Sequence, residues 1–202
     1  MYGRKRKGVK EKSRTPPGES RAAGPIPAPG DLQVVQAFLN TVQFETGKDE
    51  LATPRDLADW LSRNGLLPAG SELAAADLGR ARDARAGLRA LFTAQAGEVD
   101  EQAMSRLDRA AAGARAQVRF DRDGTTRLEH VSRDFDDALG TLLGLVHAAR
   151  CAGQWPAFKI CAHSRCRNAF YDFTKSCNGK WCSRRCGDKV RAKTFRRKQQ
   201  RY

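Results

Sequence analysis

Five of the six cysteines lie in the last 42 residues of the chain. Cys161 and Cys166 form one close pair, and Cys182 and Cys186 form another, directly after Trp181. Two close pairs joined by a short loop bring four thiolates to one point, and a tetrahedral thiolate site selects Zn²⁺. We therefore predict one structural zinc ion in a closed site, with no position left for a reacting water molecule.

The sequence allows two ways of choosing the four ligands. The set that we favour is Cys161, Cys166, Cys182 and Cys186. The other set replaces Cys186 by Cys177 and has a plausible turn at Asn178-Gly179 inside its loop. We favour the first because the segment from Cys182 to Cys186 is a compact turn that can run straight into a helix, whose amide hydrogens satisfy the thiolate charge. His163 could reach the metal only by displacing a cysteine, so we expect it at the surface.

The segment after Cys186 contains no helix breaker beyond Gly187 and is rich in cations. As a helix it would carry Lys189, Lys193, Arg196 and Arg197 along one broad side, a surface suited to phosphate groups. Val190, Thr194 and Phe195 would face the zinc site. The candidate nucleic-acid contacts are Arg184, Arg185, Lys189, Arg191, Lys193, Arg196, Arg197 and Lys198.

The net charge of +14 is concentrated at the two ends of the chain. Residues 1–14 carry +6 and residues 175–202 carry +10, which leaves −2 for everything between them. Charge placed beside a metal site indicates a polyanionic partner whose counterions are released on binding. Solvated, disordered tails are the alternative, and they fit residues 1–14 better than residues 175–202.

Several aromatic residues surround the cysteines: Phe158, Phe170, Tyr171, Phe173 and Trp181. A module this small cannot bury enough surface to fold alone, so we expect these rings and the metal to form its core. A platform on which bases stack is the alternative. Cys151 ends an apolar helical pattern outside the cluster, and we expect a buried thiol there.

The rest of the chain predicts a mainly α fold with a small β-hairpin (α+β), in which a helical body precedes the zinc module and its basic C-terminal helix. Residues 1–30, basic and then proline-rich, are expected to be a disordered arm. Residues 31–153 form the body, and residues 156–202 form the zinc module. Apolar spacing and caps predict helices over 31–47, 53–65, 74–96, 98–112 and 133–150, the last capped by Ser132, and a hairpin over 116–130. Arg80, Arg82 and Arg89 are interpreted as a solvated helix face.

The motifs Cys161-x4-Cys166, Trp181-Cys182-Ser183 and Cys186-Gly187, followed by an arginine-rich helix, resemble the CGNR zinc finger of bacterial proteins. The body is similar to the ABATE domain that precedes that finger, in the segments Phe38-Leu39-Asn40-Thr41, Thr53-Pro54-x-Asp56-Leu57 and Gly65-Leu66-Leu67-Pro68. The resemblance covers roughly residues 31–200. It implies a stress-induced transcription regulator, with a DNA-binding finger and a regulatory or ligand-binding body.

The resemblance assigns the zinc to Cys161, Cys166, Cys182 and Cys186. The chain departs from the family motif where Cys-Gly-Asn-Arg becomes Cys186-Gly187-Asp188-Lys189. If these two side chains contact nucleic acid, the contact here is weaker or different, because a forked donor has become a point charge. If they only cap the following helix, Asp188 serves as well as asparagine.

The leading hypothesis is a cytoplasmic, nucleoid-associated regulator that binds DNA through the zinc module. An RNA- or ribosome-associated protein and a small-molecule sensor are the alternatives. We expect no enzyme, since the sequence offers neither a nucleophile–base pair nor an open metal site, and His130 and His147 stand alone. A small-molecule effector and a homodimer are compatible with the sequence. The chain shows no secretion signal and no apolar run long enough for a membrane span.

Overall fold

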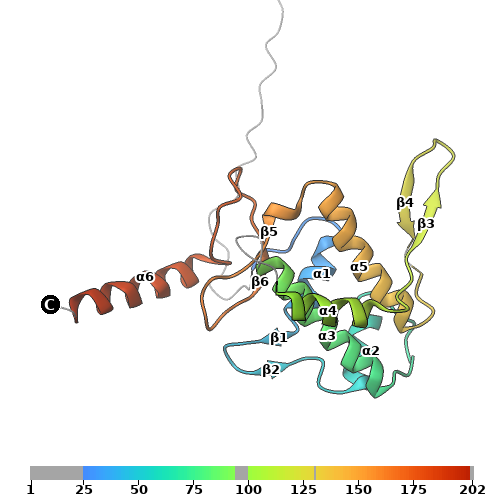
Figure 1. Cartoon of the computed structure of the whole chain (residues 1–202), viewed down its shortest axis with the longest axis horizontal. Helices are drawn as coiled ribbons and strands as arrows, with labels where there is room; N and C mark the ends of the chain where they lie inside the picture. Colours follow the sequence, from blue (N-terminus) through green and yellow to red (C-terminus); the bar gives the residue numbers. More distant parts are fainter. Residues whose placement is uncertain (1–24, 94–99, 130, 201–202) are drawn as a thin grey trace, which may run out of the picture.

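The computed structural model describes residues 25–93, 100–129 and 131–200 (Figure 1). Within these ranges it confirms the mainly α, α+β fold. The helices are α1 (Leu32–Leu39), α2 (Pro54–Arg63), α3 (Ala75–Thr93), α4 (Glu101–Ala111), α5 (Phe135–Cys151) and α6 (Arg184–Gln199). The antiparallel strand pairs are β1 (Val42–Gln43) with β2 (Lys48–Asp49), β3 (Gln117–Phe120) with β4 (Thr126–Glu129), and β5 (Phe158–Ile160) with β6 (Ala169–Tyr171).

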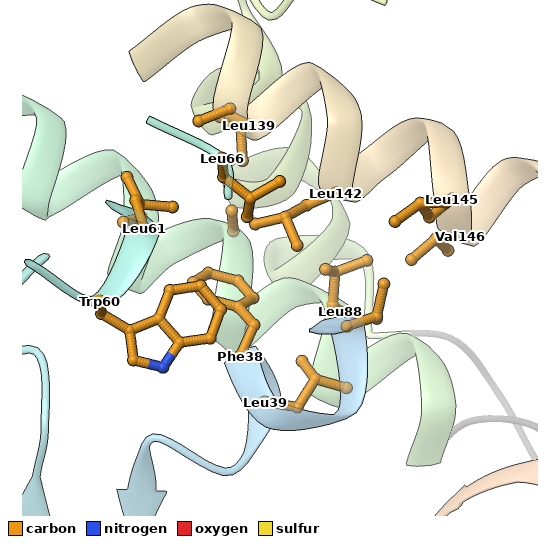
Figure 2. Close-up of a cluster of buried hydrophobic side chains, with 14 of the residues drawn as sticks. Phe38, Leu39, Trp60, Leu61, Leu66, Leu88, Leu139, Leu142, Leu145 and Val146 are labelled. Atoms are coloured by element: carbon orange, nitrogen blue, oxygen red, sulfur yellow. The ribbon is translucent and has the colours of Figure 1, made fainter. Parts of the chain in front are cut away.

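The long helix α3 is central to the body. It packs against α1, α2 and α4, while α5 packs against α1 and α4. Their apolar faces form one core, in which the rings of Phe38 and Trp60 lie 5.6 Å apart (Figure 2). The largest fully buried apolar side chains are Phe38, Leu39, Leu51, Leu57, Leu61, Leu88, Leu139, Leu142 and Val35.

Local capping signals placed two elements correctly. Thr53 accepts a hydrogen bond from the amide of Asp56, whose side chain in turn accepts one from the amide of Thr53, and this reciprocal pair starts α2. Gly65 ends it with a φ of 70°, which favours glycine. The predicted hairpin is also confirmed, with Gly124 at a φ of 83° in its turn.

Two predicted helix limits are wrong. The first helix ends at Leu39 rather than near Gly47, because the chain turns into the short β1–β2 hairpin, with the hydroxyl of Thr41 donating to the carbonyl of Phe38. The last body helix is capped by Asp134, which accepts from the amide of Asp137, and not by Ser132. The turn into the β1–β2 hairpin overrides the local pattern at the first helix, and a nearer capping carboxylate overrides it at the last body helix.

The arginines of α3 do not form one solvated face, although Arg82 is exposed. Arg89 is 5% exposed, and Arg80 and Arg82 donate to backbone carbonyls of other segments. Arg85, also buried, makes a two-pronged contact with Asp49, at 2.7 and 2.6 Å. The guanidinium groups of α3 therefore hold loops against the body.

The zinc module shares the core of the body. Phe158 and Ala169 belong to the main apolar cluster, and the ring of Phe158 lies 4.5 Å from that of Phe92 on α3. Asn40 completes the junction: its side-chain oxygen accepts from the amide of Ala169 at 2.7 Å, and its side-chain nitrogen donates to the carbonyl of Ala169 at 3.0 Å. This pair of bonds imitates the neighbour that a further strand would give to β6.

Three further expectations concern Cys151, the N-terminal arm and membrane spans. Cys151 is exposed rather than buried, because it lies in the last turn of α5. The predicted disordered arm falls mostly on residues 1–24, and His130 also lies outside the described residues. Ala28, at the end of that arm, is buried and donates its amide to Gln36 at 2.6 Å. Within the described residues, no helix has the length and apolar character required to cross a membrane.

Candidate zinc centre and basic helix

Four cysteines converge where the loop between β5 and β6, the loop after β6 and the start of α6 meet. The sulfur atoms of Cys161, Cys166, Cys182 and Cys186 all lie within 4.8 Å of one another. The Cys182 and Cys186 sulfurs are 3.8 Å apart. Tetrahedral Zn–S bonds of about 2.3 Å require sulfur–sulfur distances of about 3.8 Å, so the four atoms fit one zinc ion.

Backbone hydrogen bonds hold the ligands in place. The amide of Cys161 donates to Asn168 at 2.8 Å and the amide of Cys166 donates to His163 at 2.9 Å, which closes the first ligand loop. At the second loop, the hydroxyl of Ser183 accepts from the amide of Cys186, capping α6 directly at the metal. The ligands are thus fixed by a turn and by a helix start, as the compact Cys182–Cys186 spacing predicts.

The structure decides between the two ligand sets. Cys177 lies outside the sulfur cluster, and its thiol points to the carbonyl of Thr174, 3.5 Å away. The set containing Cys177 is therefore wrong. His163 is not among the ligands; it is half-buried rather than at the surface, and its Nδ1 has no partner in the described part of the chain.

Without a cation, the crowded thiols cannot all ionise. Hydrogen bonds from Cys166 and Cys182 lower the pKa of Cys161, and in return the Cys161 thiolate raises the pKa of Cys166 to about 12 and that of Cys182 further still. Cys166 and Cys182 are thus held in the protonated form mainly by hydrogen bonding to Cys161, and charge repulsion adds to this effect. A divalent ion removes this conflict, so zinc binding must release protons and its strength must fall in acid.

Trp181 packs against the first turn of α6. A side chain at Gly187 would place its Cβ 3.2 Å from the Trp181 ring, so the close approach favours the absence of a side chain. The guanidinium of Arg191 lies over the same ring, 5.7 Å from its centre. Trp181 also packs on Cys161 and Phe170 within the apolar cluster of the zinc module, and it therefore connects the metal site to the helix.

All eight predicted nucleic-acid contacts lie on α6. All of them except the half-buried Lys189 are exposed, and so is every residue from Arg191 to Gln200. In Figure 1, α6 projects from the molecule at the end opposite to the β3–β4 hairpin. The prediction that Thr194 and Phe195 face the zinc module is wrong, since both are exposed, Phe195 by 63%, about two turns beyond the last buried residue of α6.

The two residues that depart from the family motif make contacts within the protein. Lys189 pairs with Glu45 of the β1–β2 hairpin at 3.0 Å, and this contact lowers the pKa of Glu45. Asp188 pairs with Arg191 at 2.6 Å. Asp188 does not cap the helix, because Ser183 fills that position.

Sequence reasoning missed the residues that join the body to the zinc module. Arg89 donates to the carbonyl of Leu39 at 2.6 Å and also to the carbonyl of Arg167, inside the loop that follows Cys166. Both Arg89 and Arg167 lie over the ring of Phe44, at 4.6 and 4.7 Å. Burial lowers the pKa of Arg89 to about 10, and the guanidinium stays charged at neutral pH. The sequence gives no local sign of these contacts, which join four segments.

The aromatic residues near the cysteines divide into two groups. Phe170 and Trp181 form the core of the zinc module, while Phe158 and Tyr171 pack into the core of the body. Phe173 is 57% exposed and belongs to neither. The expected core role is thus confirmed for four of the five rings, although two of them serve the body rather than the metal site.

Comparison with known families covers both parts of the chain. Residues 32–154 match the ABATE family, described as "Putative stress-induced transcription regulator". The chain belongs to this family. Residues 158–199 of this ABATE protein match the CGNR zinc finger, whose four cysteines correspond to the sulfur cluster. No curated protein matches the chain.

Proposed function

We propose that this ABATE protein regulates transcription by binding duplex DNA through α6. The observation that carries the proposal is a zinc-anchored helix whose outer half is exposed on every side and strongly cationic. A helical segment as short as this outer half would be marginal in water on its own. A partner that packs along one side of α6, such as DNA whose major groove admits a helix, would explain why the outer half of α6 has few apolar residues and packs against no other part of the protein that the structure describes.

The charge distribution of α6 supports a phosphate-rich partner. Arg185, Lys193, Arg196 and Arg197 are exposed along one side of the helix and have no ion pair within the described residues; Lys198, also unpaired there, lies on the opposite side. Lys189 and Arg191 are held by Glu45 and Asp188, so they fix the helix rather than extend its reach. The 16 residues of α6 span about 24 Å at 1.5 Å per residue, enough to cross a groove and touch both of its phosphate walls.

The zinc ion would act as a structural part of this interface. It would fix Cys182 and Cys186, and with them the direction in which α6 leaves the body. We infer that the body reads a signal, and that the protein acts by binding rather than by catalysis. His147 lies 3.6 Å from the Cys151 sulfur, but on an exposed helix end and with no carboxylate bonded to it in the described part of the chain.

The test compares two cysteine variants of the full chain in DNA binding. Cys182→Ser removes a zinc ligand, whereas Cys177→Ser removes a thiol outside the cluster and is the matched control. Zinc content is measured with a chelating dye, and affinity by fluorescence anisotropy against duplex DNA, duplex RNA and single strands.

We expect Cys182→Ser to lose zinc and DNA affinity together, and Cys177→Ser to keep both. Duplex DNA should compete best among the nucleic acids. Tighter binding of duplex RNA, or DNA affinity that persists without zinc, would overturn the proposal.

A further inference from the structure

A pocket of about 790 Å³ lies between the end of α3 and the zinc module. Phe92 and Thr93 line it from the body, and segments on both sides of the metal site line it from the module. Its volume falls in the usual range for small-molecule sites. The module contributes Pro156, Lys159, Ile160, Cys161, Ala162, Ser164, Arg167, Cys177, Asn178, Gly179 and Lys180.

The pocket has an apolar wall. Phe92 is a buried ring that lies 4.6 Å from the ring of Trp155 and 4.5 Å from that of Phe158, so it contributes only a small, fixed apolar edge to the pocket. Ile160 and Ala162 extend this surface along the strand that leads to the metal site. A ligand with a flat, apolar body would bury area against these side chains.

The polar side of the pocket is cationic. Arg167 and Lys180 are exposed and have no ion pair within the described residues, and no carboxylate is among the lining residues. Lys159 differs, because its ammonium already bonds Asp172 at 3.1 Å together with the carbonyls of Cys177 and Gly179. Neither cation has a carboxylate partner within the described residues, although the Arg167 guanidinium also lies over the ring of Phe44, so both remain able to pair with an anion.

Two non-glycine residues that line the pocket have left-handed backbone conformations. Arg167 and Cys177 have φ values of 51° and 43°, in the left-handed region, and both line the pocket. Such conformations persist only where surrounding contacts impose them, and they gather at ligand sites. Arg89 imposes the shape of Arg167 by donating to its carbonyl from the body.

From these observations we infer that the pocket binds a small organic anion with an apolar, aromatic body. The anion would pair with Arg167 and Lys180 while its ring packs on Ile160 and Ala162 and against the edge of Phe92. One lining residue, Cys161, is a zinc ligand, and Phe92 belongs to α3, so the ligand touches both parts of the protein. The binding inference stands apart from the proposed DNA function, because its test contains no nucleic acid.

The experiment is calorimetric titration of the zinc-loaded full chain with 2-naphthoate, with the neutral 2-naphthalenemethanol as its isostere. We expect saturable binding of one naphthoate per chain. The alcohol should bind at least about tenfold more weakly, because it offers no charge to the two cations.

The first variant is Arg167→Asn with Lys180→Gln, which removes both cations while asparagine tolerates the left-handed backbone. Its control is Arg165→Gln with Lys175→Gln, which removes the same charge from exposed positions of the module outside the pocket. We expect naphthoate affinity to fall by about tenfold or more in the first and by less than about twofold in the control.

A second variant keeps the proposal testable if the first loses zinc. Ala162→Trp fills the pocket without removing charge, and it should abolish naphthoate binding while zinc content and thermal midpoint stay near those of the parent chain. Equal binding of naphthoate and the alcohol, equal losses in the double variant and its control, or unchanged binding in a folded Ala162→Trp protein would each overturn the inference.

Discussion

Removing two charges from one side of α6 should change the salt dependence of DNA binding by a defined amount. On a helix with 3.6 residues per turn, Arg185, Lys193, Arg196 and Arg197 share a side with Lys189, which Glu45 holds. If these four free cations contact phosphates, the slope of log affinity against log salt is about −3.6. Raising the salt from about 50 to about 200 mM would then weaken binding about 150-fold.

The variant Lys193→Gln with Arg197→Gln removes two of the four contacts. Its slope should fall to about −1.8, so the same salt increase would weaken binding only about 12-fold. The control, Arg184→Gln with Lys198→Gln, removes equal charge from the other side of α6 and should keep a slope near −3.6. Anisotropy titrations of a short labelled duplex at several KCl concentrations give the slopes directly.

Two results would refute this reasoning. Equal slope changes in both double variants would mean that α6 attracts DNA through its total charge, without one side that contacts the phosphates. An unchanged slope in both would mean that phosphates are contacted elsewhere, and α6 would lose its role as the contact surface.

Three further predictions concern the framework. Gly140→Ala should cost more than about 3 kcal/mol of unfolding free energy in urea titrations, because the new Cβ would lie 1.8 Å from the carbonyl oxygen of Arg115; a loss below 1 kcal/mol would contradict the close approach. Arg85→Met should cost about 3–5 kcal/mol by leaving the Asp49 carboxylate without its buried partner, and a neutral result in the same assay would show that water replaces it. The pKa of Asp137 is lowered to about 2, first by its hydrogen bond with Arg133, so its carboxylate stabilises the fold above about pH 4 and this stabilisation is lost toward pH 2. Asp137→Asn should therefore lower the unfolding free energy by about 1–2 kcal/mol at pH 7. If the difference in unfolding free energy between this variant and the parent chain does not narrow between pH 4 and pH 2, the linkage is disproved.

Features encoded in short stretches of sequence could be predicted. The ligand spacing, the Thr53 cap and the helix after Cys186 each depend on neighbours within a few residues, and the structure has all three. The favoured ligand set needed only one further argument, that Cys182 and Cys186 start a helix. Local physics decides these elements because their hydrogen bonds close over short distances along the chain.

Features that depend on distant partners could not be predicted. Arg89 looks like an ordinary surface position of an alanine-rich helix, and only the fold brings it under Phe44 and the loop after Cys166. The β1–β2 hairpin has two-residue strands, too short for a period to be recognised. Asn40 binds Ala169 across 129 positions, a separation over which sequence spacing carries no information.

The shared core between body and zinc module limits how relatives could be recombined. A cut near residue 156 would expose Phe158 and leave the edge of β6 without Asn40, so neither fragment is a clean building block. Within the described residues, the portion of α6 that makes no hydrogen bond, ion pair or ring contact with the body or the metal site begins beyond Arg191, and every residue from Ala192 to Gln200 is exposed. Between related proteins, therefore, only the outer part of α6 can be exchanged by itself, whereas the body and the metal site must be kept together.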